Sequence, residues 1–296
     1  MSELRHSESG TRGVQRFVRR QISGALRALS DHRVPSDETV HDTRKRLKRA
    51  RAGLRLLREE VGERRYRREN ALVRDVARPL TELRDAKVLI DAFDEITEGV
   101  RNHAIEKELR PVRVQLQKRK REIRRRLAGD QGAIAQIRRS LRKETKRARQ
   151  CTVGHRGWSV LGPGLSRVYR KGRRTLARAQ REHSVENLHE LRKQAKYLWN
   201  DLRILKPVAP RPIERRIALL DRLGHALGDD HDRAALRDYL SRHCSELSGK
   251  SASAVFSRID RQRHVLERRS LAIATRIYAD KPKSFARRMR DYWRAW

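Results

Sequence analysis

Two stretches of this sequence carry a histidine followed by basic residues at the spacing of a helix face, and such residues bind phosphate oxygens. Residues 40–57 read VHDTRKRLKRARAGLRLL, and residues 188–205 read LHELRKQAKYLWNDLRIL. At an offset of 148 residues His41 matches His189, and Lys48 matches Lys196. Guanidinium forks and ammonium groups both suit phosphate oxygens. The pattern therefore indicates a binding surface for anions, present twice.

Each stretch is predicted to be a helix with a buried stripe and a cationic stripe side by side. Apolar residues recur in alternating steps of three and four, which is typical of one core-facing stripe. One position further on, about 100° around the helix, lies the cationic stripe. It comprises His41, Arg44, Lys48, Arg51, Arg55 and Arg58 in the first helix, and His189, Arg192, Lys196, Trp199, Arg203 and Lys206 in the second. Like charges at this spacing cost a few tenths of a kcal/mol per pair, so either an anion is bound there or the stripe is a solvated face.

The composition supports a polyanionic partner. The 296 residues include 74 arginines and lysines against 37 acids, a formal net charge of +37. A polyanion relieves the self-repulsion of such a chain and releases its own condensed counter-ions on binding. DNA, RNA, polyphosphate and an anionic membrane all meet this description. Aromatic residues make up only 5%, which limits stacking on bases.

The remaining sequence predicts an all-α fold. Hydrophobic residues, 37% of the chain, recur at helical spacing, and glycine and proline cluster at a few breaks. A second pair of similar segments, 82–93 and 229–240, aligns Asp85 with Asp232 at an offset of 147 residues. We therefore expect one domain, residues 1–296, made of two halves (13–150 and 164–296). Each half is expected to be a four-helix bundle, the two related by a pseudo-two-fold axis.

Other classes of site find less support. Residues 228–232, GDDHD, could bind a divalent metal, but the matching segment of the first half has no histidine. The alternative is that Asp85 and Asp232 pair with arginine or histidine and fix the packing of helices. His41 and His189 lie near helix starts, where the helix dipole disfavours a charged imidazole. The sequence lacks a P-loop, a dinucleotide-binding glycine turn and a GxSxG motif, so we expect no catalytic residues, no metal and no cofactor.

The compartment expected from the sequence is the cytoplasm. The first ten residues have no apolar run typical of a signal peptide, and no stretch of about 18 apolar residues predicts a membrane span. Cys151 and Cys244 are far apart and belong to no CxxC pair, which fits a reducing compartment.

The H-[DE]-x-R-K-x-x-K motif, present at His41 and again at His189, resembles the signature of the CHAD family, the conserved histidine α-helical domain. The resemblance covers nearly the whole chain, without a preceding triphosphate-tunnel domain. It implies two helical bundles around a basic cavity or pore that binds inorganic polyphosphate, and association with polyphosphate granules. The residues it implicates are His41, Arg44, Lys45, Lys48, Arg51, Arg55, His189, Arg192, Lys193, Lys196 and Arg203.

Two departures from an even repeat are visible. Trp199 stands where the first half has Arg51, and His231 stands where it has Arg84. The two halves are therefore not expected to contribute equally to the site. The alternatives to polyphosphate binding are a nucleic-acid-binding protein and, less favoured, a metal-dependent phosphohydrolase that uses the GDDHD segment.

Overall fold

A computed structural model describes residues 4–6, 8–30, 35–98, 103–129, 133–149, 157–243 and 249–296. All regular structure in these ranges is helical, with no strand, and the predicted all-α class is confirmed. In the first half the helices are α1 (Gly10–Ser30), α2 (Asp37–Leu56), α3 (Arg58–Val61), α4 (Glu63–Val76), α5 (Arg78–Thr97), α6 (His103–Gly129) and α7 (Ala133–Arg149). In the second they are α8 (Trp158–Arg181), α9 (Val185–Leu205), the short 3₁₀ helix η1 (Lys206–Val208), α10 (Pro210–His243), α11 (Gly249–Ile277) and α12 (Pro282–Ala295).

The two cationic segments form α2 and α9, and each begins with the same cap. Ser36 Oγ accepts a hydrogen bond from the backbone N–H of Thr39 at 3.1 Å, and Ser184 Oγ accepts one from that of Asn187 at 3.2 Å. A serine in this position satisfies an N–H group that the first helical turn leaves unpaired. The caps, like the helix starts Asp37 and Val185, are 148 residues apart. Each helix therefore begins three residues before its repeated stretch, at the same place in both halves.

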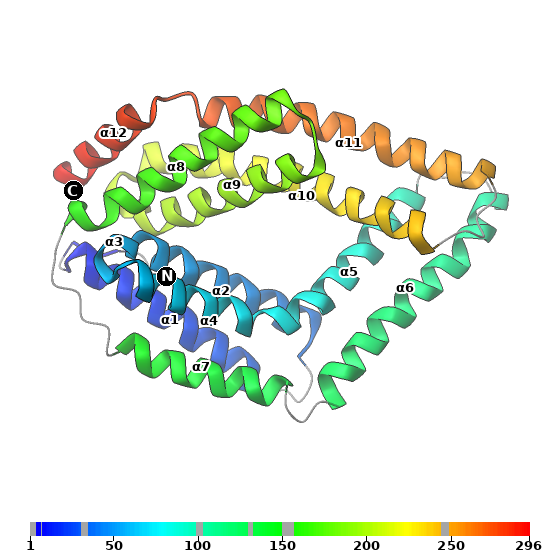
Figure 1. Ribbon diagram of the computed structural model, residues 1–296, viewed down its shortest axis with the longest axis horizontal. Helices are drawn as coiled ribbons and strands as arrows, with labels where there is room; N and C mark the ends of the chain where they lie inside the picture. The colour runs from blue at the N-terminus through cyan, green and yellow to red at the C-terminus, as the bar shows by residue number, and fades with distance from the viewer. Residues whose placement is uncertain are drawn as a thin grey trace.

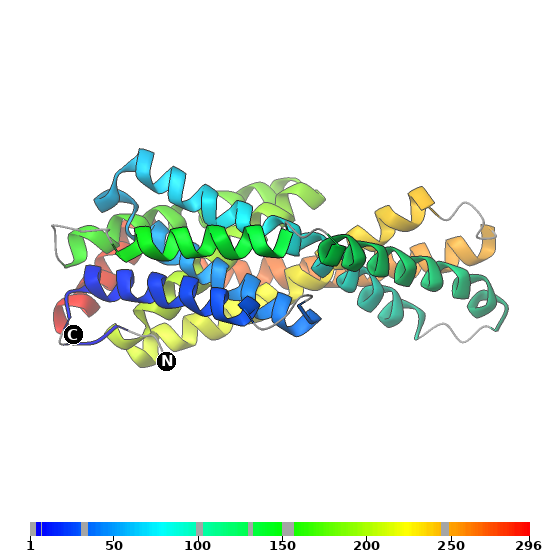
Figure 2. The ribbon, with the colours of Figure 1, turned by 90° about the horizontal axis from the view of Figure 1, so that it is seen from below.

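The helices form a body and an arm (Figures 1 and 2). The body contains α1, α2, α4, α7, α8, α9 and α12, and the arm contains α5 and α6 beside the distal parts of α10 and α11. The larger hydrophobic cluster joins buried residues of both halves, among them Leu47, Leu80, Leu198 and Leu223. A smaller cluster in the arm includes Ile90, Leu116, Leu236 and Ile259. Because the larger core is shared, the halves are packed into one body, and their two-fold relation stays a prediction.

The glycine- and proline-rich segment between the halves is shorter than the sequence indicated. The second half was expected to begin at residue 164, but α8 begins at Trp158 and includes Pro163. As the sixth residue of α8, Pro163 removes one backbone hydrogen bond and its ring crowds the carbonyl four residues earlier, yet the helix continues through it. Residues 152–156 lie outside the described residues.

Gly164 allows α8 to lie against α2, and its replacement is expected to be costly. A Cβ atom on Gly164 would lie 2.8 Å from the carbonyl oxygen of Arg55 and 2.9 Å from the Cα of Leu56, both backbone atoms. We expect Gly164→Ala to lower the free energy of unfolding by about 1–3 kcal/mol, as measured by urea denaturation, because the helices must move apart. Gly224→Ala in α10 is the matched control, because nothing lies within 4 Å of its Cβ position. It should be neutral or stabilising, by up to about 1 kcal/mol; equal losses in both variants would contradict the close-packing argument.

Candidate functional site

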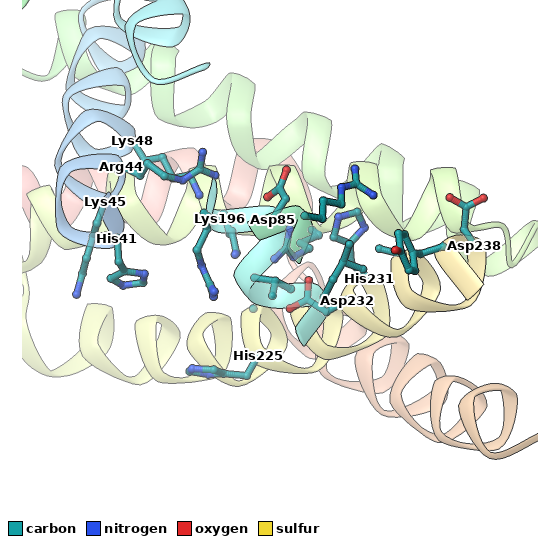
Figure 3. A pocket seen from close by; sticks show the side chains of 18 of the residues that line it. His41, Arg44, Lys45, Lys48, Asp85, Lys196, His225, His231, Asp232 and Asp238 are labelled. Atoms are coloured by element: carbon teal, nitrogen blue, oxygen red, sulfur yellow. The ribbon is translucent and has the colours of Figure 1, made fainter. Parts of the chain in front are cut away.

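A cavity of about 1290 Å³ lies between α2, α5, α6, α9 and α10 (Figure 3). Among the described residues, ten arginine and lysine side chains line it against five carboxylates. The cations are Arg44, Lys45, Lys48, Arg84, Lys118, Arg119, Arg192, Lys196, Arg203 and Arg242. The carboxylates are Asp85, Glu122, Asp221, Asp232 and Asp238. The lining therefore carries an excess of positive charge drawn from both halves of the chain.

Two lysines of this lining, Lys48 from α2 and Lys196 from α9, are strongly affected by their surroundings. Burial, with the nearby cations Arg44 and Lys196, lowers the pKa of Lys48 to about 7. Burial, with Arg192 beside it, lowers the pKa of Lys196 to about 8. Each lysine is thus poorly solvated and close to other positive charges. An anion in the cavity would favour the charged form of both.

The arginines that precede these lysines by one turn are held in different ways. Arg44 donates a hydrogen bond from its guanidinium to the hydroxyl of Thr81 in α5. The Nε–H of Arg192 in α9 is buried and has no hydrogen-bond partner among the described residues. The same holds for the indole N–H of Trp199, which also belongs to the cavity lining. Buried donors without a partner are costly, so the wall of the cavity on the α9 side has unused hydrogen-bonding capacity.

The two repeated aspartates lie inside the cavity. Burial raises the pKa of Asp85, although Arg44, Lys48 and Arg84 act in the opposite direction. Burial likewise raises the pKa of Asp232, opposed by Arg192, Arg84 and Lys196. Each carboxylate therefore interacts with cations of both halves. No ion pair within 4 Å joins either carboxylate to another described residue, so the expectation that they pair with arginine or histidine and fix the packing of helices stays a prediction.

Three histidines at the cavity, His41, His189 and His231, have pKa values lowered by their surroundings, which favours the neutral imidazole. Burial and the nearby Arg84 and Lys45 lower the pKa of His41, and burial with Arg192 lowers that of His189. His231 is affected most, its pKa falling to about 4 through burial and the nearby Arg192. The rings of His189 and His231 lie with their centroids 4.7 Å apart. The neutral state was predicted from the helix dipole, but desolvation is its leading cause.

Seven of the eleven predicted site residues line the cavity. From α2 these are His41, Arg44, Lys45 and Lys48, and from α9 they are Arg192, Lys196 and Arg203. The other four belong elsewhere. Arg51 donates a hydrogen bond to the side chain of Asn70 at 2.8 Å, and Lys193 forms an ion pair of 2.7 Å with Glu190. His189 packs on His231 behind the lining.

Arg55 was predicted to bind the anion, but the structure places it in a buried contact between helices. It is 7% exposed and lies 3.5 Å from the carboxylate of Asp201, which is completely buried. Its guanidinium also covers the ring of Tyr197, at 3.7 Å from the centroid. Burial raises the pKa of Asp201 to about 7, with Arg55 acting against the shift. Arg55 therefore joins α2 to α9 inside the protein.

The structure adds cations that the repeated motif did not identify. Lys118 and Arg119 come from α6, Arg84 from α5, and Arg242 from the end of α10. The run QKRKREIRRR at 117–126 showed that α6 is basic, but not which of its faces meets the cavity. His225 and His243 also belong to the lining.

The GDDHD segment is divided between two environments. It lies within α10, where Asp230 is buried and forms an ion pair of 3.0 Å with Arg263 of α11. His231 and Asp232 face the cavity instead (Figure 3). Among the residues that the structure describes, no group of three or more histidine, cysteine, aspartate or glutamate side chains could hold a metal ion. Nor does any helix in those ranges have the length and apolar character needed to cross a membrane.

Comparison with known proteins gives one family and one fold. A family model described as the CHAD domain matches residues 20–241. The crystal structure of the CHAD domain from the plant Ricinus communis resembles this chain with a TM-score of 0.63 and 15% sequence identity, covering 94% of each chain. At that identity the likeness shows the fold alone. The comparison with curated proteins gives no match.

Proposed function

Because the chain belongs to the CHAD domain family, we propose that it binds inorganic polyphosphate in the cationic cavity and thereby associates with polyphosphate granules in the cytoplasm. The observation that carries this proposal is the lining, where ten arginines and lysines from five helices surround one space with only five carboxylates. Desolvation lowers the pKa of Arg44, Lys48, Arg192 and Lys196, so the repulsion among these cations is only partly screened by water. A chain of phosphates supplies the negative charge and the hydrogen-bond acceptors that would balance these cations.

The aromatic residues of the cavity favour a ligand without bases. Binding of single-stranded nucleic acid normally uses exposed aromatic faces on which bases stack. Of the two large aromatic side chains in the lining, Trp199 is covered by the guanidinium of Arg203 at 4.7 Å, and Tyr239 stacks on His243 at 4.5 Å. These faces are already occupied. Nucleic acid is therefore the second candidate.

We propose binding without catalysis. The described lining contains no serine, threonine or cysteine that could act as a nucleophile. Of its histidines, His41 and His231 have lowered pKa values, and its central aspartates interact with several cations each. These groups hold and orient the basic side chains, and the proposed role needs no chemical step.

A competition titration tests the ligand. Labelled long-chain polyphosphate is bound at about 0.15 M salt, near physiological ionic strength. Unlabelled polyphosphate, duplex DNA, single-stranded RNA and triphosphate then compete at equal phosphate concentration. The proposal expects long polyphosphate to compete best, since more phosphates release more counter-ions. Equal or better competition by DNA or RNA would instead favour nucleic acid as the ligand.

Affinity for polyphosphate should fall as the pH rises. Free Lys48 and Lys196 have pKa values of about 7 and about 8. A bound polyanion raises both values, so binding takes up protons once the free lysines begin to lose theirs. We expect affinity to be constant below about pH 6.5 and to decrease through pH 7–9. For each proton taken up on binding, the affinity should fall by up to tenfold per pH unit. Calorimetry in buffers of different ionisation enthalpy measures the proton uptake.

The double variant Lys48→Arg, Lys196→Arg provides the control for this pH dependence. Arginine stays charged throughout the range, so the variant should bind without the loss between pH 7 and 9. If wild-type affinity is flat over that range, or if the double variant shows the same decrease, the two lysines are not the titrating groups.

A further inference from the structure

Two helices on the exterior of the protein contain no acidic residue at all. Neither α1 (Gly10–Ser30) nor α8 (Trp158–Arg181) includes an aspartate or glutamate, although both are rich in arginine. Their exposed cations that form no ion pair with another described residue are Arg12, Arg20 and Arg27 on α1, and Arg170, Arg174, Arg178 and Arg181 on α8. Each helix thus presents a purely cationic stripe to solvent.

Each of these helices packs beside a second basic helix. Next to α1 lies α7, whose single acid, Glu144, is only 4% exposed and bonds to Arg147. The exposed cations of α7 without a described ion pair are Arg139, Arg142, Lys143 and Lys146. Next to α8 lies α12, which exposes Lys283, Arg287 and Arg294 in the same way. We call the α1–α7 set the lower face and the α8–α12 set the upper face.

The two faces lie on different sides of the body. In Figure 1, α1 and α7 form the lower side, and α8 and α12 lie above α2 and α9. Figure 2, seen from below, shows α1 and α7 side by side in front, with α12 behind them. No residue of α1, α7, α8 or α12 lines the cavity. Both faces are therefore separate from the site described above.

The high net charge alone does not produce such faces, because the arm carries a mixed surface. There several basic residues pair with acids of neighbouring helices: Arg113 with Asp94 at 2.8 Å and Arg237 with Asp260 at 2.9 Å. Helix α6 of the arm also exposes unpaired cations such as Lys107 and Arg110, but it carries acids among them, as at Glu106. Exposed like charges on one helix destabilise it. On the upper face some cations are paired, Arg167 with Glu59 and Lys171 with Glu190 on α8, and Arg288 with Asp280 and Arg290 with Asp291 on α12. The cations named above for the two faces have no such pair with another described residue.

We propose that the lower and upper faces each bind a further segment of polyphosphate, so that one molecule bridges separate polyphosphate chains. This inference rests on the proposed function and extends it from holding a chain to cross-linking chains. Simultaneous binding at two sites on opposite sides of one rigid body converts weak surface contacts into a network. The cavity then fixes a chain, and the faces bring others next to it.

The chemistry of the faces favours a polyphosphate over other anionic partners. Among the described residues, the exposed large hydrophobic side chains are Val114, Val185 and Val265, none of which belongs to either face, so the described part of the faces offers no such side chain for insertion into a lipid surface. The aromatic residues Tyr292, Trp293 and Trp296 at the end of the chain are partly buried against the core. The faces therefore offer charge without an apolar or stacking component.

Light scattering with long-chain polyphosphate tests the bridging. Three variants each remove four positive charges: Arg139, Arg142, Lys143 and Lys146→Gln on the lower face; Arg174, Arg178, Arg287 and Arg294→Gln on the upper face; and Lys107, Arg110, Lys250 and Arg261→Gln on the arm. For wild type we expect scattering to rise to a maximum and to fall again in excess polyphosphate, when every face holds its own chain. Either face variant should lose scattering about tenfold, and the arm variant should behave as wild type.

Calorimetry with tripolyphosphate, a probe too short to bridge, separates the bridging from the cavity. Both face variants should bind it as wild type does. If all proteins fail to bind it while wild type still scatters, the cavity proposal fails and the bridging stands. The bridging is overturned if face variants scatter like wild type, or if the arm variant loses as much as they do. It is also overturned if duplex DNA produces the scattering and polyphosphate does not.

Discussion

The variant Arg44→Gln, Lys48→Gln, Arg192→Gln, Lys196→Gln should bind long-chain polyphosphate about 10³-fold more weakly than wild type. These four side chains line the cavity, two from each half, and desolvation lowers the pKa of all four. A hydrogen bond to a charged group contributes roughly 1 kcal/mol or more, so four lost contacts amount to about 4 kcal/mol, or close to three powers of ten. Fluorescence anisotropy with labelled polyphosphate measures the loss.

The matched control is the arm variant Lys107→Gln, Arg110→Gln, Lys250→Gln, Arg261→Gln, which removes the same charge from exposed positions. Its affinity should decrease by less than about tenfold, through the general field alone. Circular dichroism should show unchanged helicity in both variants, since glutamine is a good helix former. If the cavity variant binds with unchanged affinity and salt dependence, or if both variants lose equally, the cavity is not the site.

Replacing Arg55 with methionine should affect stability strongly and polyphosphate binding hardly at all. Arg55 is the only described cation within 4 Å of Asp201, whose carboxylate is fully buried and has a pKa raised to about 7. Since that folded pKa is above the ordinary value near 4, this carboxyl lowers stability progressively between about pH 4 and pH 7, and the loss ends where the folded group ionises. Without Arg55 the ionised form is disfavoured further. Urea denaturation should show a loss of about 1 kcal/mol at pH 6, from packing on Tyr197, and about 3–4 kcal/mol at pH 9.

Two comparisons make this prediction specific. Arg276→Met, on the exposed surface of α11, should change the free energy of unfolding by less than about 0.5 kcal/mol at either pH. The affinity of Arg55→Met for polyphosphate should remain within about threefold of wild type, because Arg55 does not line the cavity. A stable variant with a tenfold loss of affinity would return Arg55 to the binding site and contradict its assignment to the buried pair.

The sequence by itself determined the helical class, the two central helices and the basic residues of α2 and α9 that line the cavity. Steps of three and four between apolar residues identify a helix without reference to its neighbours. Serine side chains mark the starts of α2 and α9 through a contact only three residues long. Because the cationic stripe is defined by the same local geometry, His41, Arg44 and Lys48 could be identified together with Arg192 and Lys196. The motif also pointed to the family that the comparison shows.

Only the tertiary structure decided where each stripe meets the cavity. On α2 the lining stops at Lys48, since the helix then packs against α9 and α8, where Arg55 meets Asp201 and Tyr197. On α9 the lining continues to Arg203, which lies over Trp199. The sequence of a cationic stripe shows which side of a helix is basic. It does not show which turns of that helix are covered by a helix that crosses it.

The same reason explains the residues that the sequence did not assign. Lys118 and Arg119 belong to a helix that is basic on several faces, and only its packing beside α5 and α10 selects these two for the lining. The lowered pKa values of Lys48 and Lys196 likewise come from burial and from neighbours distant in the chain. Local periodicity fixes the face of a helix, whereas the cavity and its electrostatics arise from contacts between helices more than a hundred residues apart.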